Sequence, residues 1–364
     1  MPLRGVIGRN RKFVLMKSLT FCLLLSWLVS ACVPSTTSST SGISLPQRNE
    51  MQPSRINGIS LTASPAPMES VAFDSLKQVH ANYVCLLPFA FMRSNEPKIY
   101  FNSKHQWWGE RPEGVAACIA MAHHAGMKVM VKPQIWMHDH FTGDIQFRDE
   151  AQWKEFEENY TAYIFSLLHI SDSMKADMFC LGTELDSFVK IRPQYWEHLI
   201  DTVRSIYSGK LTYAENWDCY HDFPFWQKLD YIGINAYFPL SDEATPTTES
   251  LKSGWKKYCE PMQELSVKTG RQILFTEFGY RSIDYCARQP WNAYDSSPKN
   301  YEAQRNAYES LFSTCWNESW FAGGFSWKWF DERTEPDVSF ETDYTPQGKP
   351  AASVLRSWYA KSVN

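Results

Sequence analysis

The chain has 364 residues, of which 44% are hydrophobic, and its formal net charge is −4. This length allows one large domain or two small ones with a sizeable buried core. The near-balanced charge provides neither the basic surplus expected of a nucleic-acid partner nor the acidic run of a disordered tail. Aromatic residues make up 15% of the chain and include 15 Trp, of which a large core could absorb many.

A short apolar segment follows basic residues at the N-terminus. Leu19–Val29 is too short to span a bilayer comfortably, and small residues separate it from Cys32. This pattern resembles the lipobox of bacterial lipoproteins, which implies cleavage before Cys32 and lipid modification of its thiol. An ordinary signal peptide is the alternative. Val33 stands where an Asp would favour retention in the inner membrane, so the outer membrane is the expected location.

The composition changes after this segment. Residues 33–54 are rich in Ser, Thr and Pro and cannot bury a core, which predicts a flexible tether. The sequence therefore predicts a signal peptide over residues 1–31, a tether over 32–55 and one folded domain over 56–364.

Apolar runs alternate with helical patterns through this domain. The predicted strands are residues 56–61, 83–88, 128–136, 178–184, 210–216, 229–237, 274–280 and 322–329. The predicted helices are residues 68–79, 112–125, 150–171, 193–207, 248–268, 300–317 and 351–361. Alternating strands and helices favour parallel βα units of the α/β class, and eight strands predict a (β/α)8 barrel. An open doubly wound sheet is the runner-up, but no phosphate-binding glycine motif follows any strand.

Two predicted strands each place a carboxylate in an otherwise apolar run. One strand contains Glu277 and the other ends at Glu184. An ionised Glu among Phe, Leu and Ile is costly unless it is paired or used. Active sites of (β/α)8 barrels lie at the C-terminal strand ends, and strands four and seven lie on opposite sides of the barrel. Such a pair suits glycoside hydrolysis, which needs an acid for the leaving oxygen and a carboxylate at the anomeric carbon.

The order of these motifs resembles clan A of the glycoside hydrolases. Leu181-Gly182-Thr183-Glu184 and Phe275-Thr276-Glu277-Phe278-Gly279 are most similar to family 113, the β-1,4-mannanases. The resemblance covers about residues 56–360. It implies Glu184 as acid/base and Glu277 as nucleophile of a retaining double displacement that needs no cofactor.

Thr183 departs from the clan, because many members carry at this position an Asn that binds the sugar 2-hydroxyl. Asn216 and Asn235 are the candidates for that role here.

The resemblance also implies roles for other strand ends. Tyr237 matches the strand-six position where clan members place a group hydrogen-bonded to the nucleophile, which would hold Glu277 ionised. Trp327 resembles the strand-eight Trp beneath the scissile sugar. Lys132 has two alternatives, a hydrogen bond to a substrate hydroxyl or an ion pair with a barrel carboxylate.

Tryptophans are concentrated where a sugar cleft would lie. Eight fall at predicted strand ends or in the loops that follow, namely Trp107, Trp108, Trp136, Trp217, Trp226, Trp291, Trp327 and Trp329. The flat C–H faces and hydroxyl rim of a sugar suit such platforms. Trp136, on the same strand face as Lys132, is expected to contact substrate, as are Trp217, Trp327 and Trp329. Packing within a lid is the alternative for each loop Trp.

The cluster His138-Asp139-His140 is a candidate metal site. A metal-dependent barrel hydrolase would place an H-x-H motif on the first strand and further His at later strand ends. Here the first predicted strand has no His, the sixth ends on Asn235 and Tyr237, and His221 lies in a loop. The sequence therefore predicts no metal.

These features together predict a monomeric, lipid-anchored retaining glycoside hydrolase that acts on β-linked mannan or a related hexose polymer. Its two carboxyl groups should lie about 5–5.5 Å apart, the spacing of retaining enzymes. The alternatives are a non-catalytic glycan-binding lipoprotein on the same barrel and a metal-dependent barrel hydrolase.

Overall fold

The computed structural model describes residues 55–94, 96–138, 140–331 and 338–361. The predicted signal peptide and, except for Arg55, the predicted tether with Cys32 lie outside these residues, as does Asp139 of the histidine cluster. Within the described part of the chain, no helix combines the length and the hydropathy needed to cross a bilayer.

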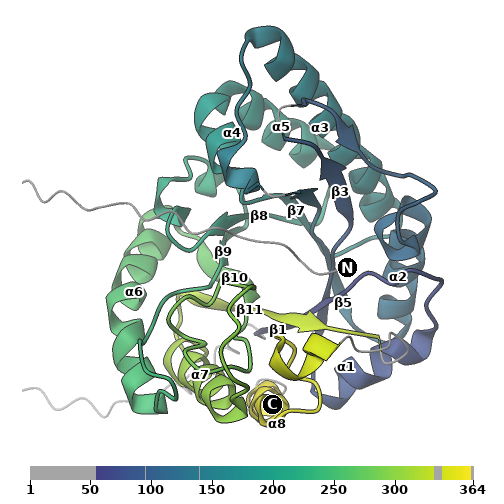
Figure 1. Ribbon diagram of the computed structural model, residues 1–364. Coiled ribbons are helices and arrows are strands. Elements are labelled where there is room, and N and C mark those ends of the chain that lie inside the picture. Colours follow the sequence, from purple (N-terminus) through teal and green to yellow (C-terminus); the bar gives the residue numbers. More distant parts are fainter. Residues whose placement is uncertain (1–54, 95, 139, 332–337, 362–364) are drawn as a thin grey trace, which may run out of the picture. The chain divides into compact units, whose positions relative to one another are not determined.

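Eight parallel strands close into a barrel, and the helices surround it (Figure 1). Around the ring the strands are β1 (Ile56–Leu61), β11 (Phe321–Trp329), β10 (Gln272–Phe278), β9 (Tyr231–Asn235), β8 (Lys210–Asn216), β7 (Met178–Thr183), β5 (Lys128–Val131) and β2 (Tyr83–Leu86). Each barrel strand pairs with the barrel strand that comes before it in the sequence, and the last strand, β11, pairs with β1. The predicted (β/α)8 barrel is therefore confirmed, and the alternative of an open doubly wound sheet is wrong.

The connecting helices largely match their predicted ranges. They are α1 (Asp74–Gln78), α2 (Pro112–His124), α3 (Glu150–Ser173), α4 (Asp186–Ile191), α5 (Pro193–Ile206), α6 (Thr248–Thr269), α7 (Tyr301–Cys315) and α8 (Pro350–Lys361). Short 3₁₀ helices cover Ser70–Phe73, Trp108–Glu110, Thr142–Asp144, Tyr220–Asp222, Trp226–Lys228 and Val338–Thr342. The side chains of Asp149, Thr247 and Asn300 accept hydrogen bonds from the first turns of α3, α6 and α7, which satisfies otherwise unpaired N–H groups. The short helix α4 was not predicted.

The third predicted strand is two strands in the structure. β5 belongs to the barrel, whereas β6 (Gln134–Met137) pairs with β3 (Phe89–Met92) in a separate sheet that also contains β4 (Ile99–Tyr100). Pro133 separates the two strands and has no N–H to donate to a ladder. The prediction of one continuous strand over 128–136 is therefore wrong, and the three-stranded sheet was missed.

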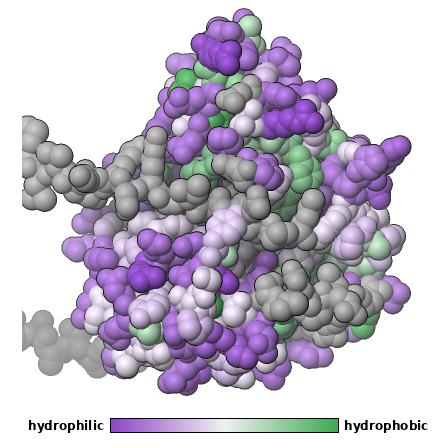
Figure 2. All heavy atoms as spheres, in the orientation of Figure 1, coloured by the Kyte–Doolittle hydropathy of each residue, from purple (hydrophilic) through white to green (hydrophobic). Residues whose placement is uncertain are grey.

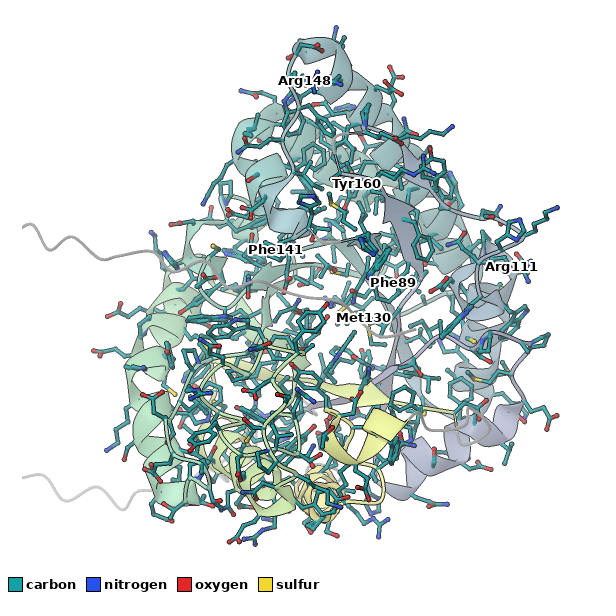
Figure 3. The ribbon with its side chains drawn as sticks, viewed as in Figure 1. Phe89, Arg111, Met130, Phe141, Arg148 and Tyr160 are labelled. Atoms are coloured by element: carbon teal, nitrogen blue, oxygen red, sulfur yellow. The ribbon has the colours of Figure 1, made fainter. Side chains whose placement is uncertain are left out.

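Apolar side chains fill both the barrel and the layer between strands and helices. The inner cluster includes Met130, Cys180, Leu274 and Phe325, all fully buried. Met130 lies near the centre of the ring of strands, with Phe89 of β3 close to it in the same view (Figure 3). This packed interior closes the barrel below the ends of the strands, where the predicted site residues lie.

Gly233 brings β8 and β9 together just before the site. A Cβ atom at this position would lie 2.0 Å from the carbonyl oxygen of Tyr213, so only glycine allows this approach. β8 and β9 then run in register to Asn216 and Asn235 at their ends.

Candidate active site

Glu277 lies in β10, almost fully buried, with donors to both carboxylate oxygens. The Tyr237 hydroxyl donates to Oε2 at 2.7 Å. Oε1 accepts from the Lys132 ammonium and, at 3.2 Å, from the Gln134 amide. Lys132 is 0% exposed and forms an ion pair with Glu277. Of its two predicted roles, the structure shows the ion pair.

The positive charge of Lys132 is retained in this buried position. Burial alone would lower the pKa of Lys132, but the adjacent Glu277 carboxylate raises that pKa above its ordinary value. The ammonium also lies 5.9 Å from the ring centroid of Trp327, a distance at which a cation interacts favourably with an aromatic face. Lys132 therefore provides a fixed positive charge directly beside Glu277.

Glu184 follows the last residue of β7 and has an unusual backbone. Its φ angle is +51°, in the left-handed region that non-glycine residues rarely adopt. Its own N–H donates to Ala214 at 2.8 Å, and the next N–H, of Leu185, donates to the Tyr213 hydroxyl at 2.7 Å. These two bonds to β8 hold the turn that directs the Glu184 side chain into the site.

A short hydrogen-bond chain connects Glu184 to Thr276, the residue that precedes Glu277 in β10. Thr276, next to Glu277, donates to the Asn235 side-chain oxygen at 2.9 Å. The Asn235 amide group in turn donates to Glu184 Oε1 at 2.8 Å. An irregularity in the pairing of β10 with β9 falls between Phe275 and Glu277, and such bulges re-aim side chains near active sites. The Asn235 amide is thereby oriented with its donor toward Glu184.

The environment of Glu184 favours its protonated form. Burial, followed by the charge of Glu277, raises the pKa of Glu184 to about 7. The Asn235 hydrogen bond and the Lys132 charge act in the opposite direction but are smaller. Two carboxyl groups that influence one another in a buried site, one protonated and one ion-paired, can act as an acid and a nucleophile.

The other residues predicted to contact substrate do not all lie beside the two carboxyl groups. Tyr237 and Trp327 belong to the inner apolar cluster at the strand ends, and Trp217 packs against that cluster. The Asn216 side chain accepts from the Trp217 backbone N–H at 2.9 Å. Trp329 does not join them, because its indole N–H donates to Ser75 at 3.0 Å in the layer between barrel and helices.

Three further tryptophans at or after strand ends also differ in their surroundings. Trp226 is buried in the outer layer and donates to the carbonyl oxygen of Tyr220 at 2.8 Å. Trp291 stacks on Trp217 with ring centroids 5.1 Å apart. Trp136 is half-buried on β6 and borders an open pocket, together with His138.

The contacts of three polar residues near the carboxyl pair were not predicted from the sequence, although Gln134 was expected on the same strand face as Lys132 and Trp136. Gln134 and Thr276 make the contacts described above, but their partners depend on register between distant strands. Glu215 of β8 is buried and accepts from the Asn216 N–H at 2.9 Å. Burial raises the pKa of Glu215 well above its ordinary value. A carboxyl in the apolar strand Leu211–Glu215 was the available signal for this last residue.

The fold and the site define the class of protein as a (β/α)8 barrel with a buried carboxyl pair at the ends of its fourth and seventh barrel strands. The family model of Glycoside Hydrolase Family 113 matches residues 64–349. The chain belongs to this family and is a glycosyl hydrolase, which confirms the family predicted from the sequence.

Solved structures show the same fold. The GH113 β-mannanase AaManA from Alicyclobacillus acidocaldarius is 22% identical with a TM-score of 0.74, over 86% of this chain and 99% of that one. A GH113 β-1,4-mannanase is 23% identical with a TM-score of 0.72, over 84% and 99% of the two chains. Ruminococcus gnavus β-glucuronidase, 14% identical with a TM-score of 0.58, covers 85% of this chain and 50% of its own. No curated protein sequence matches.

Proposed function

We propose that the protein hydrolyses β-1,4-linked mannan or mannooligosaccharides with retention of anomeric configuration. The observation that carries this proposal is the unequal environment of Glu184 and Glu277, one raised in pKa by burial and the other paired with Lys132. The GH113 structures with the same fold are described as β-mannanases, which supports mannan as the substrate.

In the first step, Glu184 donates its proton to the glycosidic oxygen while Glu277 attacks the anomeric carbon. The bond to the leaving sugar breaks and a covalent glycosyl ester forms at Glu277. In the second step, the Glu184 carboxylate takes a proton from water, and the resulting nucleophile displaces Glu277. Lys132, Gln134 and Tyr237 balance the negative charge on Glu277 before attack and after release.

Hydrolysis of a panel of defined glycans tests the substrate. We expect release of reducing sugar from mannan and mannohexaose and little from cellulose, xylan or a β-glucuronide. Proton NMR during the first turnovers should show the β-anomer of the product before mutarotation. An α-anomer would refute the retaining mechanism, and hydrolysis of another polymer alone would refute mannan as the substrate.

Variants of the two carboxyl groups test the mechanism. Glu277→Gln and Glu184→Gln should each lower kcat by about 10³-fold or more on mannan. Added azide should partly restore a Glu184→Ala variant assayed with an activated aryl glycoside and give a β-glycosyl azide, because azide attacks the covalent intermediate in place of the water that Glu184 activates. Treatment with a chelator should leave the wild-type rate unchanged. A rate lost with the chelator would instead support the metal-dependent alternative.

A further inference from the structure

The three-stranded sheet β4–β3–β6 carries a row of aromatic side chains on one face. Phe91 of β3 pairs with Tyr100 of β4 on one side and with Trp136 of β6 on the other. Residues directly opposite one another project to the same face of a sheet. The Phe91 and Trp136 rings are 5.9 Å apart in an edge-to-face contact. These three residues, Tyr100, Phe91 and Trp136, are termed the aromatic row.

The opposite face of the same sheet already attaches it to the protein core. Ala90, Met92, Ile99 and Met137 are buried in the outer apolar cluster. By contrast, Phe91 and Trp136 are half-buried and Tyr100 is 37% exposed. On the face of the molecule in view, apolar atoms gather where Figure 1 places β3 (Figure 2). The aromatic row is therefore not needed to anchor the sheet.

The face that carries the aromatic row begins at the nucleophile. Gln134, which donates to Glu277 at 3.2 Å, is opposite Phe89 in the register of β3 and β6. Trp136 follows two residues later, about 7 Å along the strand on the same face. That advance exceeds the length of one pyranose ring. A glycan chain whose scissile sugar lies at Glu277 would therefore meet the aromatic row with a sugar further along the chain.

The row borders a pocket of about 730 Å³ with a polar rim. The rim includes Arg93 and Glu96, which form an ion pair at 3.6 Å, and the Tyr100 hydroxyl is 3.4 Å from Glu96. Aromatic walls suit the C–H faces of a sugar, and the rim provides donors and acceptors for its hydroxyl groups. Because the rim carries both signs of charge, it fits a neutral hexose better than a uronic acid.

We propose that the aromatic row is a remote glycan-binding subsite that holds a neutral hexose of the substrate, at least one sugar away from the bond that is cleaved. This inference rests on the proposed function. It makes the enzyme selective for chains long enough to reach from Glu277 to the pocket.

The chain-length dependence of hydrolysis tests the inference. The kcat/KM ratio of mannohexaose to an aryl β-mannoside should fall about tenfold in Tyr100→Ala and Phe91→Ala. Phe165→Ala provides a matched control, because Phe165 is a half-buried aromatic on the outer helix α3. Its ratio should equal that of the wild type. An unchanged ratio in both row variants, with thermal unfolding midpoints near that of the wild type, would overturn the inference.

Binding measured without turnover separates this inference from the proposed function. Affinity electrophoresis of Glu277→Gln in gels containing glucomannan, galactomannan or xylan should show retardation by at least one polymer. Adding Tyr100→Ala should abolish that retardation, whereas adding Phe165→Ala should not. No retardation by any of the three polymers, or equal retardation with and without Tyr100→Ala, would refute the subsite. Absence of mannan hydrolysis by the wild type would refute only the proposed function.

Discussion

Lys132 is the residue that makes the two carboxyl groups of the site different. It is the cation beside Glu277, and its charge also acts on Glu184. The sequence indicated both carboxyl groups, because each interrupts an apolar strand. It left the partner of Lys132 open, because the contact joins strands 145 residues apart. The contacts of Gln134 and Thr276 were not predicted for the same reason, since the sequence of one strand does not determine its register with another.

The raised pKa of Glu184 predicts a basic limit to activity. In the proposed mechanism, Glu184 must be protonated to assist the leaving group, and burial raises its pKa to about 7. We therefore expect kcat/KM on mannohexaose to fall as pH rises through about 7. A dinitrophenyl β-mannoside, whose leaving group needs no proton, should show little of this decline. A decline equally steep for both substrates would mean that the ionisation of a group other than Glu184 causes the loss of activity at high pH, the basic limb of the pH profile.

Removing the charge of Lys132 should move that limit. Lys132→Met eliminates a positive charge that lowers the pKa of Glu184, so the basic limb should shift to higher pH. The kcat/KM should also fall, by about 10²-fold or more, because Glu277 loses its ion pair. The pH profile of kcat/KM measures both effects.

Lys328→Met is the matched control for Lys132→Met. Lys328 is also a buried lysine, but its ion pair, at 3.4 Å, is with Asp343. This variant should lose stability without moving the basic limb. The same shift in both variants would show that the limb responds to general damage rather than to the Lys132 charge.

At the scale of elements, the barrel strands could be predicted and the three-stranded sheet could not. Each barrel strand is an apolar run bounded by turn residues, so its existence follows from hydrophobic pattern. β3 and β4 are only four and two residues long and lie in a segment without regular alternation. β6 continues the apolar run of β5, and only the missing N–H of Pro133 reveals the break. The aromatic row was therefore predicted only through Trp136.

The loops that follow β8 and β10 are joined by the stacked pair Trp217 and Trp291. Their rings are 19° from parallel, and such pairs contribute about 0.5–1.5 kcal/mol beyond area burial. A double-mutant cycle of Trp217→Ala and Trp291→Ala, measured by urea unfolding, should show a coupling energy in this range. The cycle of Trp217→Ala with Trp358→Ala, on the distant helix α8, should be additive. Additivity in both cycles would mean that the stack does not couple the loops.

For the whole molecule, buried carboxyl groups should make stability decrease toward alkaline pH. Burial raises the pKa of Glu215 well above its ordinary value. Between the unfolded and the folded pKa, the folded chain holds a proton that the unfolded chain has released, so the free energy of unfolding falls as pH rises. The slope is about 1.4 kcal/mol per pH unit for each such group.

Glu215→Gln should flatten this dependence, because the amide keeps an acceptor for the Asn216 N–H and cannot ionise. Urea unfolding between pH 5 and pH 8 measures how the free energy of unfolding depends on pH in each variant. Glu260→Gln, at an exposed position of α6, serves as the control and should retain the wild-type slope. A Glu215→Gln slope equal to that of the control would exclude Glu215 as a source of the pH dependence.

The predicted lipid anchor is tested on the full chain in bacterial cells. We propose that Cys32 carries the lipid, so Cys32→Ala should move the protein from the membrane fraction to the soluble fraction and stop incorporation of labelled fatty acid. Cys22→Ala, within the preceding apolar run, should change neither result. Membrane association that survives in Cys32→Ala would leave an ordinary signal peptide or another attachment as the explanation.

At Glu184, the requirements of catalytic activity and of folding stability conflict. A residue with φ of +51° and a buried acid group both cost folding free energy, and neither is required by the barrel. Glu184→Gln keeps the left-handed backbone but removes the ionisable group, so it should unfold at a higher temperature than the wild type at alkaline pH while being inactive. In a library of variants selected only for heat resistance, replacements of Glu184 should therefore accumulate, and the variants that unfold at the highest temperature should include inactive ones.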